Sequence, residues 1–545
     1  MQVHWLAALM CVLILPLLLL LWAGGLWVFQ QTFMAGGGQD LGLRFVLWAS
    51  AKQSSQVLLA VLMVCAVLGV GLGWLMSQYR FTGKAAFEWL LLAPLAVPSF
   101  VSAHAWTQLL AYDAALASGL RASGWVERLP DVRTAAGAGC VLGLALFPYV
   151  YTLARVAFAS AAQRNRGLRA AATSLGASQK EVFWRVNLPL TLPALAAGLA
   201  LVGMEALADY GAVAYLGVDT FTVSIYKTWF GADQKNAAIA LVTVLLTVVA
   251  VLLAVQKKWL GQSRRYQLTL LPQAEPLPAL RAGLNVAAFS ACALITALGF
   301  ALPLGSLLWS LASNPDAQLS APQFARVGQA VWHSIQVASV GAAAVMLLAF
   351  CVVAAQFAQA KGRWLNQTVA VAQLGYAVPG AAIAMALLWP IAAIDHAIAD
   401  ALSALTGQKV GLLLVGSMTV LVYAYALRFF AVAYGSVSQA AQRVSSSAFE
   451  AALSLGATRK QAIVAVLWPA LRPSVAAGFM LAWIDCLKEL PATLMLRPFN
   501  FDTLPVLAYQ WVADERAAQA ALPSLILVLV GLAPVWWLRK AQKMC

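Results

Sequence analysis

The sequence predicts an all-α polytopic membrane protein of about twelve transmembrane helices, arranged as two parallel six-helix repeats. Three observations predict this class. Hydrophobic residues make up 62% of the chain and charged residues 10%, apolar runs recur along its whole length, and one thirty-residue segment occurs twice. Soluble domains carry about 25% charged residues, so lipid must be the solvent for much of this chain.

The apolar runs are long enough to cross a bilayer, which takes about 20 helical residues. Because lipid offers no hydrogen-bond partners, each run is expected to be helical. The first six runs lie near residues 5–29, 54–77, 86–111, 135–159, 190–217 and 235–256. The second six lie near residues 282–310, 329–357, 365–394, 410–434, 471–496 and 519–538. The first run lacks a basic n-region and exceeds a signal-peptide core, so we interpret it as an uncleaved span.

The charges indicate orientation rather than a nucleic-acid partner. The net charge is +15, but the basic residues form short clusters between the apolar runs and no continuous patch. Most of them fall on the inner loops if the N-terminus is cytoplasmic, so both termini are expected in the cytoplasm. Cysteines and histidines are dispersed, and we therefore predict no disulfide, no metal site, no cofactor and no catalytic residues.

The repeat divides the chain into two units. Residues 169–198 align with residues 449–478 at an offset of 280, with thirteen identical positions among the thirty. Such self-similarity indicates duplication. We expect a first unit at 1–260, a cytoplasmic linker at 261–281 and a second unit at 282–545. Each half holds an even number of spans, so both copies should sit the same way up, around an axis along the membrane normal with a central pathway.

The repeated segment predicts a rigid cytoplasmic elbow in each half. The first elbow covers residues 164–190 and the second covers residues 444–470. Each has a glycine thirteen residues before a proline, and this matching spacing favours docking of a soluble partner. A stiff loop lying on lipid headgroups is the alternative.

The second elbow has the clearer local signals. Ser446 or Ser447 is expected to cap a short helix, and Gly456 to end it with a positive φ. A second amphipathic helix is expected over residues 457–466, with Pro469 at the entry to the next span.

Residues of this elbow resemble the EAA loop of binding-protein-dependent ABC importer permeases. Those residues are Glu450, Ala451, Ala452, Gly456 and Pro469. The resemblance implies the type I permease fold, in which this loop seats in a groove of an ATP-binding cassette subunit, here expected in two copies. The chain has no GxxxxGK[ST] phosphate-binding motif, so we expect a separate subunit to hydrolyse ATP and this chain not to be an enzyme.

The first elbow departs from that motif at one position. Ala171, Ala172, Gly176 and Pro189 match, but Ala170 stands where the family has glutamate. The resemblance therefore implies that the two contacts with the ATP-binding subunits are unequal.

Paired carboxylates follow each elbow. Glu205 and Asp209 in the fifth span superpose on Asp485 and Glu489 in the eleventh, and the spacing places each pair on one helix face. Ionisable groups at membrane depth usually face a pathway, so these four predict a route for a cationic substrate and no tightly bound metal. Structural pairing with Lys488 is the alternative.

Each acid pair is followed by a helix-breaking residue. Gly211 and Pro491 occupy corresponding positions after the two pairs. A break beside a substrate route is familiar in transporters, and the end of the helix is the other interpretation.

The stretches around these acids resemble fused ferric-iron importer permeases. They are LADYGAVAYLGVDTFTVSIYKTWF (207–230) and KELPATLMLRPFNFDTLPVLAYQW (488–511). The resemblance implies Fe(III) delivered by a periplasmic binding protein to a bacterial inner-membrane permease. The carboxylates alone would suit thiamine or another small cation equally. A secondary transporter is the alternative from another class, although it has no reason to duplicate a cytoplasmic elbow.

Overall fold

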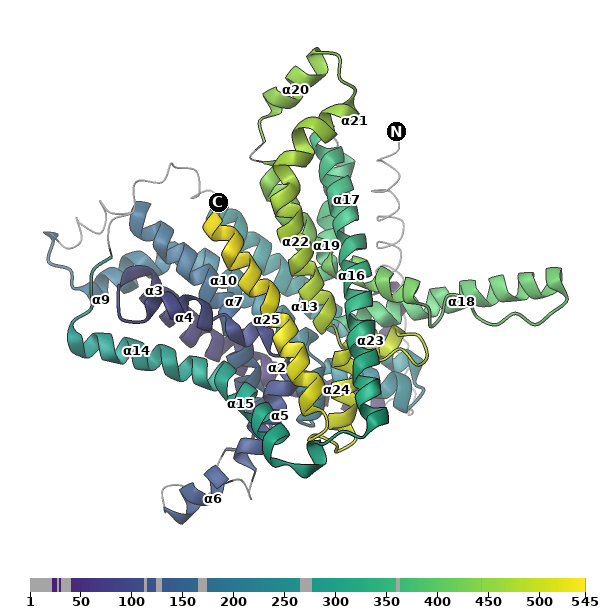
Figure 1. The fold of residues 1–545 in the computed structure, drawn as a ribbon, viewed down its shortest axis with the longest axis horizontal. Helices are drawn as coiled ribbons and strands as arrows, with labels where there is room; N and C mark the ends of the chain where they lie inside the picture. The colour runs from purple at the N-terminus through teal and green to yellow at the C-terminus, as the bar shows by residue number, and fades with distance from the viewer. Residues whose placement is uncertain are drawn as a thin grey trace. The chain divides into compact units, whose positions relative to one another are not determined.

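A computed structural model describes residues 22–26, 29–30, 41–111, 115–123, 130–164, 174–264, 277–358, 363–442 and 444–544. These residues are helices and connections, without a β-strand longer than one isolated bridge. The all-α prediction is thus confirmed. The helices form two compact units (Figure 1). We name them the N-terminal unit, residues 41–224 and 244–317, and the C-terminal unit, residues 1–40, 225–243 and 318–545.

Within the described residues, the N-terminal unit has sixteen helical elements. They are α2 (Leu41–Cys65), η2 (Ala66–Val70), α3 (Gly71–Gln78), α4 (Lys84–Leu90), η3 (Ala93–Ala96), α5 (Ser99–Leu110), α6 (Ala115–Ala122), α7 (Ala135–Arg164), α9 (Gln179–Val182), η4 (Phe183–Asn187), α10 (Leu188–Ala208), α11 (Gly211–Tyr215), α14 (Ala282–Thr296), η6 (Ala297–Ala301), α15 (Leu302–Ser313) and η7 (Pro315–Ala317). Two further helices, α12 (Phe221–Tyr226) and α13 (Lys235–Arg264), continue from one unit into the other.

The described part of the C-terminal unit has thirteen elements of its own. They are η5 (Lys227–Gly231), α16 (Ala321–Ala358), α17 (Arg363–Ala372), η8 (Gln373–Ala377), α18 (Gly380–Thr406), α19 (Met418–Ala441), α20 (Ser446–Ser454), α21 (Arg459–Ala462), η9 (Ile463–Leu467), α22 (Trp468–Lys488), α23 (Pro491–Leu496), α24 (Leu504–Ala513) and α25 (Ala521–Met544).

In the N-terminal unit, α7 packs against α2, α3 and α10. Small residues let the backbones approach closely: a Cβ atom at Gly139 of α7 would lie 2.8 Å from the carbonyl oxygen of Val57 in α2. The helices that follow the linker also belong here, because α14 packs on α4 and α15 on α5. Two backbone hydrogen bonds with Arg80 fix the end of the linker. The Arg80 amide donates to the carbonyl oxygen of Pro278 (2.9 Å), and the Leu280 amide donates to the carbonyl oxygen of Arg80 (3.1 Å).

In the C-terminal unit, α16, α19 and α22 pack against one another. A Cβ atom at Gly341 of α16 would lie 2.9 Å from the ring of Tyr425 in α19, and one at Gly478 of α22 would lie 2.9 Å from the side chain of Ser436. Glycine is therefore needed at both helix crossings. Figure 1 shows α20 and α21 projecting past the end of this three-helix bundle.

Within the described residues, nine helices are long and apolar enough to cross a membrane. A tenth is obtained if the pair Lys84–Ala96 and Ser99–Leu110, bent by 95°, counts as one broken span. The predicted span at 86–111 is therefore not one straight helix. α25 (Ala521–Met544) lies at the predicted last span. Most of the predicted first span lies outside the described residues.

The duplication extends to details of the backbone. The π-helical turn η4 and its continuation α10 have the same bounds as η9 and α22, shifted by 280 residues. Both long helices end directly before an acid, Asp209 or Glu489, and a new short helix starts at Gly211 or Pro491. The predicted helix breaks are thus confirmed.

A pair of side-chain contacts after each break is duplicated as well. In the N-terminal unit, Gln53 and Ser54 of α2 accept hydrogen bonds from the amides of Asp219 (2.6 Å) and Phe221 (3.0 Å). In the C-terminal unit, His333 and Ser334 of α16 bond the carbonyl of Asp502 (3.1 Å) and the amide of Leu504 (2.7 Å). Each long first helix therefore holds the segment that follows the broken helix of its own unit.

The expected serine cap of the second elbow is wrong: helix α20 begins at Ser446 after Ser445, and no side-chain hydrogen bond caps that N-terminus. Residues 459–466 are helical as expected, but α21, η9 and α22 form one helical run, so this helix continues into the span. A π-helical turn carries the chain into the span, so Pro469 stands in the first turn of α22 without interrupting the helix.

Each elbow contains a capping box at its second helix. Ser178 and Glu181 form one in the first elbow, and Thr458 and Gln461 form one at the same offset in the second. In both, the long side chain accepts the amide of the capping residue at 2.8 Å. Such reciprocal bonds satisfy amide groups that the helix N-terminus leaves without partners.

Acidification is expected to loosen the first elbow and spare the second. Hydrogen bonds from the Ser178 amide and hydroxyl lower the pKa of Glu181 from its usual value of 4.5. Stabilisation by the ionised carboxylate is therefore complete above about pH 4.5 and is lost as the pH falls through the lower pKa of the folded state. Gln461 does not titrate.

Amide hydrogen exchange at residues 178–182 and 458–462 checks this prediction. Between about pH 6 and about pH 3, after correction for intrinsic exchange rates, protection should fall only in the first elbow. Glu181→Gln is the matched control and should remove the pH dependence. Equal loss of protection in both elbows would contradict the prediction.

Candidate functional site

The second elbow exposes a short helix and a glycine turn. Glu450 and Ala451 of α20 are exposed, Ala452 is half-buried, and Gly456 takes a φ of +89° with no atom near its missing side chain. The predicted positive φ is thus confirmed. Phe449 anchors the helix, since it is buried and its ring meets Phe357 of α16 edge-on at 5.2 Å.

The first elbow has the same turn. Gly176 has a φ of +85° and Pro189 stands in the first turn of α10, matching Gly456 and Pro469. Ala170, Ala171 and Ala172 lie outside the described residues.

A leucine precedes each glycine and is almost fully exposed. The exposed fraction is 88% for Leu175 and 89% for Leu455. An apolar side chain held at the tip of a polar turn is costly in water and favourable in a partner's pocket. Both elbows therefore present the same feature for a partner to bind. It is an exposed leucine next to a glycine with a positive φ, close to the start of a membrane helix.

The carboxylates of the first pair lie at the end of α10. Glu205 is in its last turn and Asp209 follows it, and both are partly buried. One carboxylate oxygen of Asp209 accepts the amide of Ala212 at 3.0 Å, and the other accepts the hydroxyl of Ser99 at the start of α5. Asp209 thus satisfies a backbone amide that the broken helix leaves without a partner.

The second pair is held by a cation. Glu489 Oε1 accepts the amide of Ala492 at 3.1 Å, the counterpart of the bond in the first pair. The same oxygen accepts Arg428 Nη1 of α19 at 2.7 Å, and the side chains of this ion pair are only 5% and 10% exposed. Removing one partner of such a buried pair typically costs about 3–5 kcal/mol.

Gly380 makes room for this ion pair. A Cβ atom there would lie 2.3 Å from both Arg428 Nη1 and Glu489 Oε1. Gly380 begins α18, as Ser99 begins α5, and both follow a proline. In one unit, a serine hydroxyl therefore donates to the acid. In the other unit an arginine donates to it, and only glycine leaves enough room for that arginine.

Sequence reasoning missed the partners of Asp209 and Glu489. It considered Lys488 as the partner of Asp485 or Glu489; Arg428 pairs with Glu489, and Lys488 interacts electrostatically with Asp485. Arg428 lies on another span, so no sequence spacing relates it to Glu489. An arginine within an apolar run was the available signal, because such residues are rarely left without a partner. Within the described residues, no group of three or more His, Cys, Asp or Glu side chains could hold a metal ion.

The chain matches the family model described as "Binding-protein-dependent transport system inner membrane component" twice, over residues 69–266 and 352–542. An Fe(3+)-transport system permease protein of Haemophilus influenzae is 26% identical over 491 residues, which cover 88% of each chain.

Shorter relatives match one part of the chain only. A molybdenum transport system permease protein of Escherichia coli is 27% identical over 40% of this chain and 95% of its own. A probable sulfate transport system permease protein of Chlorokybus atmophyticus is 28% identical over 34% of this chain and 64% of its own. Because the family model covers most of the chain and matches both halves, this protein belongs to the inner-membrane components of binding-protein-dependent transport systems, as a double permease.

Proposed function

We propose that this permease moves ferric iron from a periplasmic binding protein to the cytoplasm, driven by two copies of an ATP-binding subunit that dock on its elbows. The observation that carries the coupling role is the matched pair of exposed leucines, Leu175 and Leu455, each beside a left-handed glycine. Because each of these turns leads directly into a membrane helix, a movement of a soluble subunit bound there can move the span. The elbows, and with them both termini, are then cytoplasmic.

Family membership gives the secondary-transporter alternative no support. Members of this family depend on a binding protein, and the chain contains no phosphate-binding motif of its own. Energy must therefore come from a separate ATP-binding subunit.

Ferric iron is favoured by the extent of the similarity. The Fe(3+) relative matches 88% of this chain, whereas the molybdenum and sulfate relatives match 40% and 34%. Glu205, Asp209 and Asp485 add acidic groups at membrane depth, which suit a cation. An oxyanion is the second candidate, because the Arg428 side chain offsets the charge of Glu489. Thiamine stays a further cationic alternative.

The four carboxylates divide into two roles under this proposal. Asp209 and Glu489 shape the helix breaks, since both accept amides of the following helix. Glu205 and Asp485, one turn earlier, are then the better candidates for contact with the passing substrate.

Replacing Gly456 with valine should uncouple transport from ATP hydrolysis. Valine at this φ costs about 1–3 kcal/mol of backbone strain, and the open space around the site excludes a clash as the cause. We expect a several-fold loss of substrate uptake in proteoliposomes, with unchanged membrane insertion. Gly435→Val is the matched control, because Gly435 has open space but a helical φ. Normal uptake by Gly456→Val would refute the coupling role of the elbow.

The double change Glu205→Gln with Asp485→Asn should slow uptake of a cationic substrate. It removes two negative charges and leaves Asp209 and Glu489, the acids at the helix breaks, unchanged. The uptake rate should fall several-fold, while assembly with the ATP-binding subunit stays normal in pull-down. Asp514→Asn, an exposed acid outside the spans, is the control. Unchanged uptake would show that Glu205 and Asp485 are structural.

The substrate assignment is tested by ATPase stimulation in liposomes. The binding protein of the same transport system is presented loaded with Fe(III), molybdate, sulfate or thiamine, and the ATPase rate of the reconstituted complex is measured. Fe(III) alone should stimulate. Stimulation by an oxyanion instead would replace the proposed substrate class and leave the coupling role intact.

A further inference from the structure

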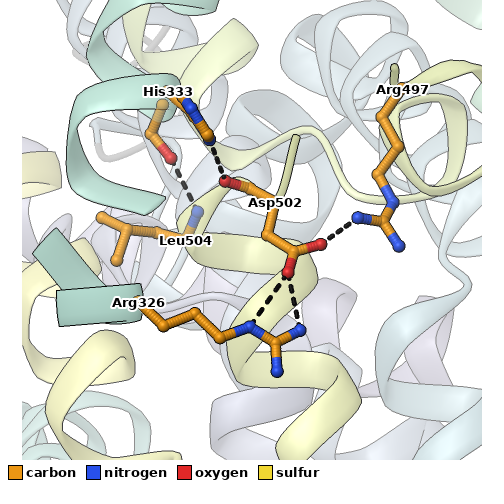
Figure 2. A network of polar contacts seen from close by, with 6 residues as sticks. Arg326, His333, Arg497, Asp502 and Leu504 are labelled. Atoms are coloured by element: carbon orange, nitrogen blue, oxygen red, sulfur yellow. Dashed lines mark hydrogen bonds and ion pairs between the residues drawn. The ribbon is translucent and has the colours of Figure 1, made fainter. Parts of the chain in front are cut away.

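The loop between α23 and α24, residues 497–503, is held rigidly in the C-terminal unit. Figure 2 shows Asp502, near the end of this loop, between two arginines. Arg326 Nη2 of α16 donates to Asp502 Oδ2 at 2.7 Å, with its Nε at 3.2 Å from the same oxygen, and Arg497 Nη1 donates to Oδ1. One carboxylate thus ties the loop to the long helix and to its own first residue.

Three further contacts fix the same loop. His333 Nδ1 lies 3.1 Å from the Asp502 carbonyl oxygen, and its ring stacks on Phe501 with the centroids 4.1 Å apart. The Leu504 amide donates to Ser334 at 2.7 Å (Figure 2). Because the bonded carbonyl is only an acceptor, Nδ1 of His333 carries the proton.

The tip of this loop exposes an aromatic side chain. Phe499 is 93% exposed, and the following Asn500 has a φ of +59°. Asparagine tolerates this conformation better than most residues. The ring is therefore presented by a preformed turn, on a loop whose base is already fixed.

Helix α16 places this loop at the far end of the unit from the second elbow. Its Phe357 contacts Phe449 of the elbow, and its Arg326 bonds Asp502. At about 1.5 Å per helical residue these contacts lie on the order of 45 Å apart, close to the full thickness of a bilayer with its headgroups, about 40–45 Å. If the elbow faces the cytoplasm, the loop faces the binding protein.

The N-terminal unit has the same loop without the exposed ring. Gln53 and Ser54 hold it, and Gly217 takes the positive φ of +72°. The residue before this glycine, Leu216, is only 2% exposed, in contrast to Phe499. The exposed aromatic tip is therefore a feature of the second copy alone.

Lipid is a poor environment for this tip. The loop is irregular backbone, which does not occur in contact with hydrocarbon, and Arg326 beside it is half exposed. Two arginines share one carboxylate, which leaves a positive charge near an apolar ring. A partner surface with an apolar pocket and acidic residues around it would complement both features.

We propose that Phe499 and the Asp502-held loop are a docking contact for the substrate-loaded periplasmic binding protein, provided by the second half only. This inference rests on the proposed function, which puts that protein on the side opposite the elbows. The ring is the anchor, and the ion pairs of Asp502 reduce the ordering cost of binding.

The test uses the full permease with its ATP-binding subunit in nanodiscs. The concentration of loaded binding protein that gives half-maximal ATPase stimulation is measured for wild type and Phe499→Ala. We expect a rise of about tenfold or more, with unchanged basal ATPase and maximal stimulation. Phe499→Trp should retain most of the affinity. Met63→Ala, a change at an exposed residue in the middle of a span, should have no effect.

Photocrosslinking separates the binding protein from lipid as the neighbour of the ring. A benzophenone amino acid at position 499 should crosslink to the purified binding protein, and the same group at position 63 should not. Crosslinks to lipid alone, or an unchanged half-maximal concentration for Phe499→Ala, would overturn the docking proposal while leaving a stimulated wild-type transporter intact. A wild-type complex that the loaded binding protein does not stimulate would overturn both proposals.

Discussion

A helix that starts after a break leaves the backbone amides of its first turn without helical partners, and buried amides cannot bond water instead. In this permease one acid in each half meets that constraint. Asp209 accepts the amide of Ala212, and Glu489 accepts the amide of Ala492 at the equivalent position. The acid is then itself a buried charge, so it needs a partner: Ser99 donates to the first, and Arg428 to the second. In each unit, another helix starts beside the break and leaves room for the partner of the acid. This helix follows Pro98 in one unit and Pro379 in the other.

This constraint explains which features the sequence could predict. Hydropathy, the offset of 280 and the glycine before each proline depend on local pattern, and they led correctly to an all-α double permease and to the left-handed turn at Gly456. Contacts between spans carry no such pattern. Nothing in the spacing relates Arg428 to Glu489, and hydropathy alone shows one apolar run where the chain bends by 95° before α5. The expected serine cap on α20 is absent, and Phe449, packed on Phe357, anchors that helix.

The two copies share a backbone but have diverged where charge matters. A serine hydroxyl beside Asp209 became the combination of Gly380 and Arg428 beside Glu489. Gln53, which bonds the loop in the first copy, corresponds to His333 in the second, where two arginines also bind Asp502. A fused chain permits this, because each half can change without imposing the same substitution on the other. The duplication therefore did not preserve the same polar partner beside the two acids.

In the C-terminal unit, one long helix connects the two surfaces that are proposed to meet soluble partners. α16 touches the second elbow through Phe357 and the Asp502 loop through Arg326 and His333. Between these ends it packs on α19 and α22, the helices that hold Arg428 and lead into Glu489. A helix of this length hardly compresses, so under the proposed function a movement of the elbow would produce a tilt or a slide against its neighbours. Because the buried ion pair joins α19 to the break after α22, such a slide would act on that break. Under both proposals, the break is the point at which the two partners would influence one another.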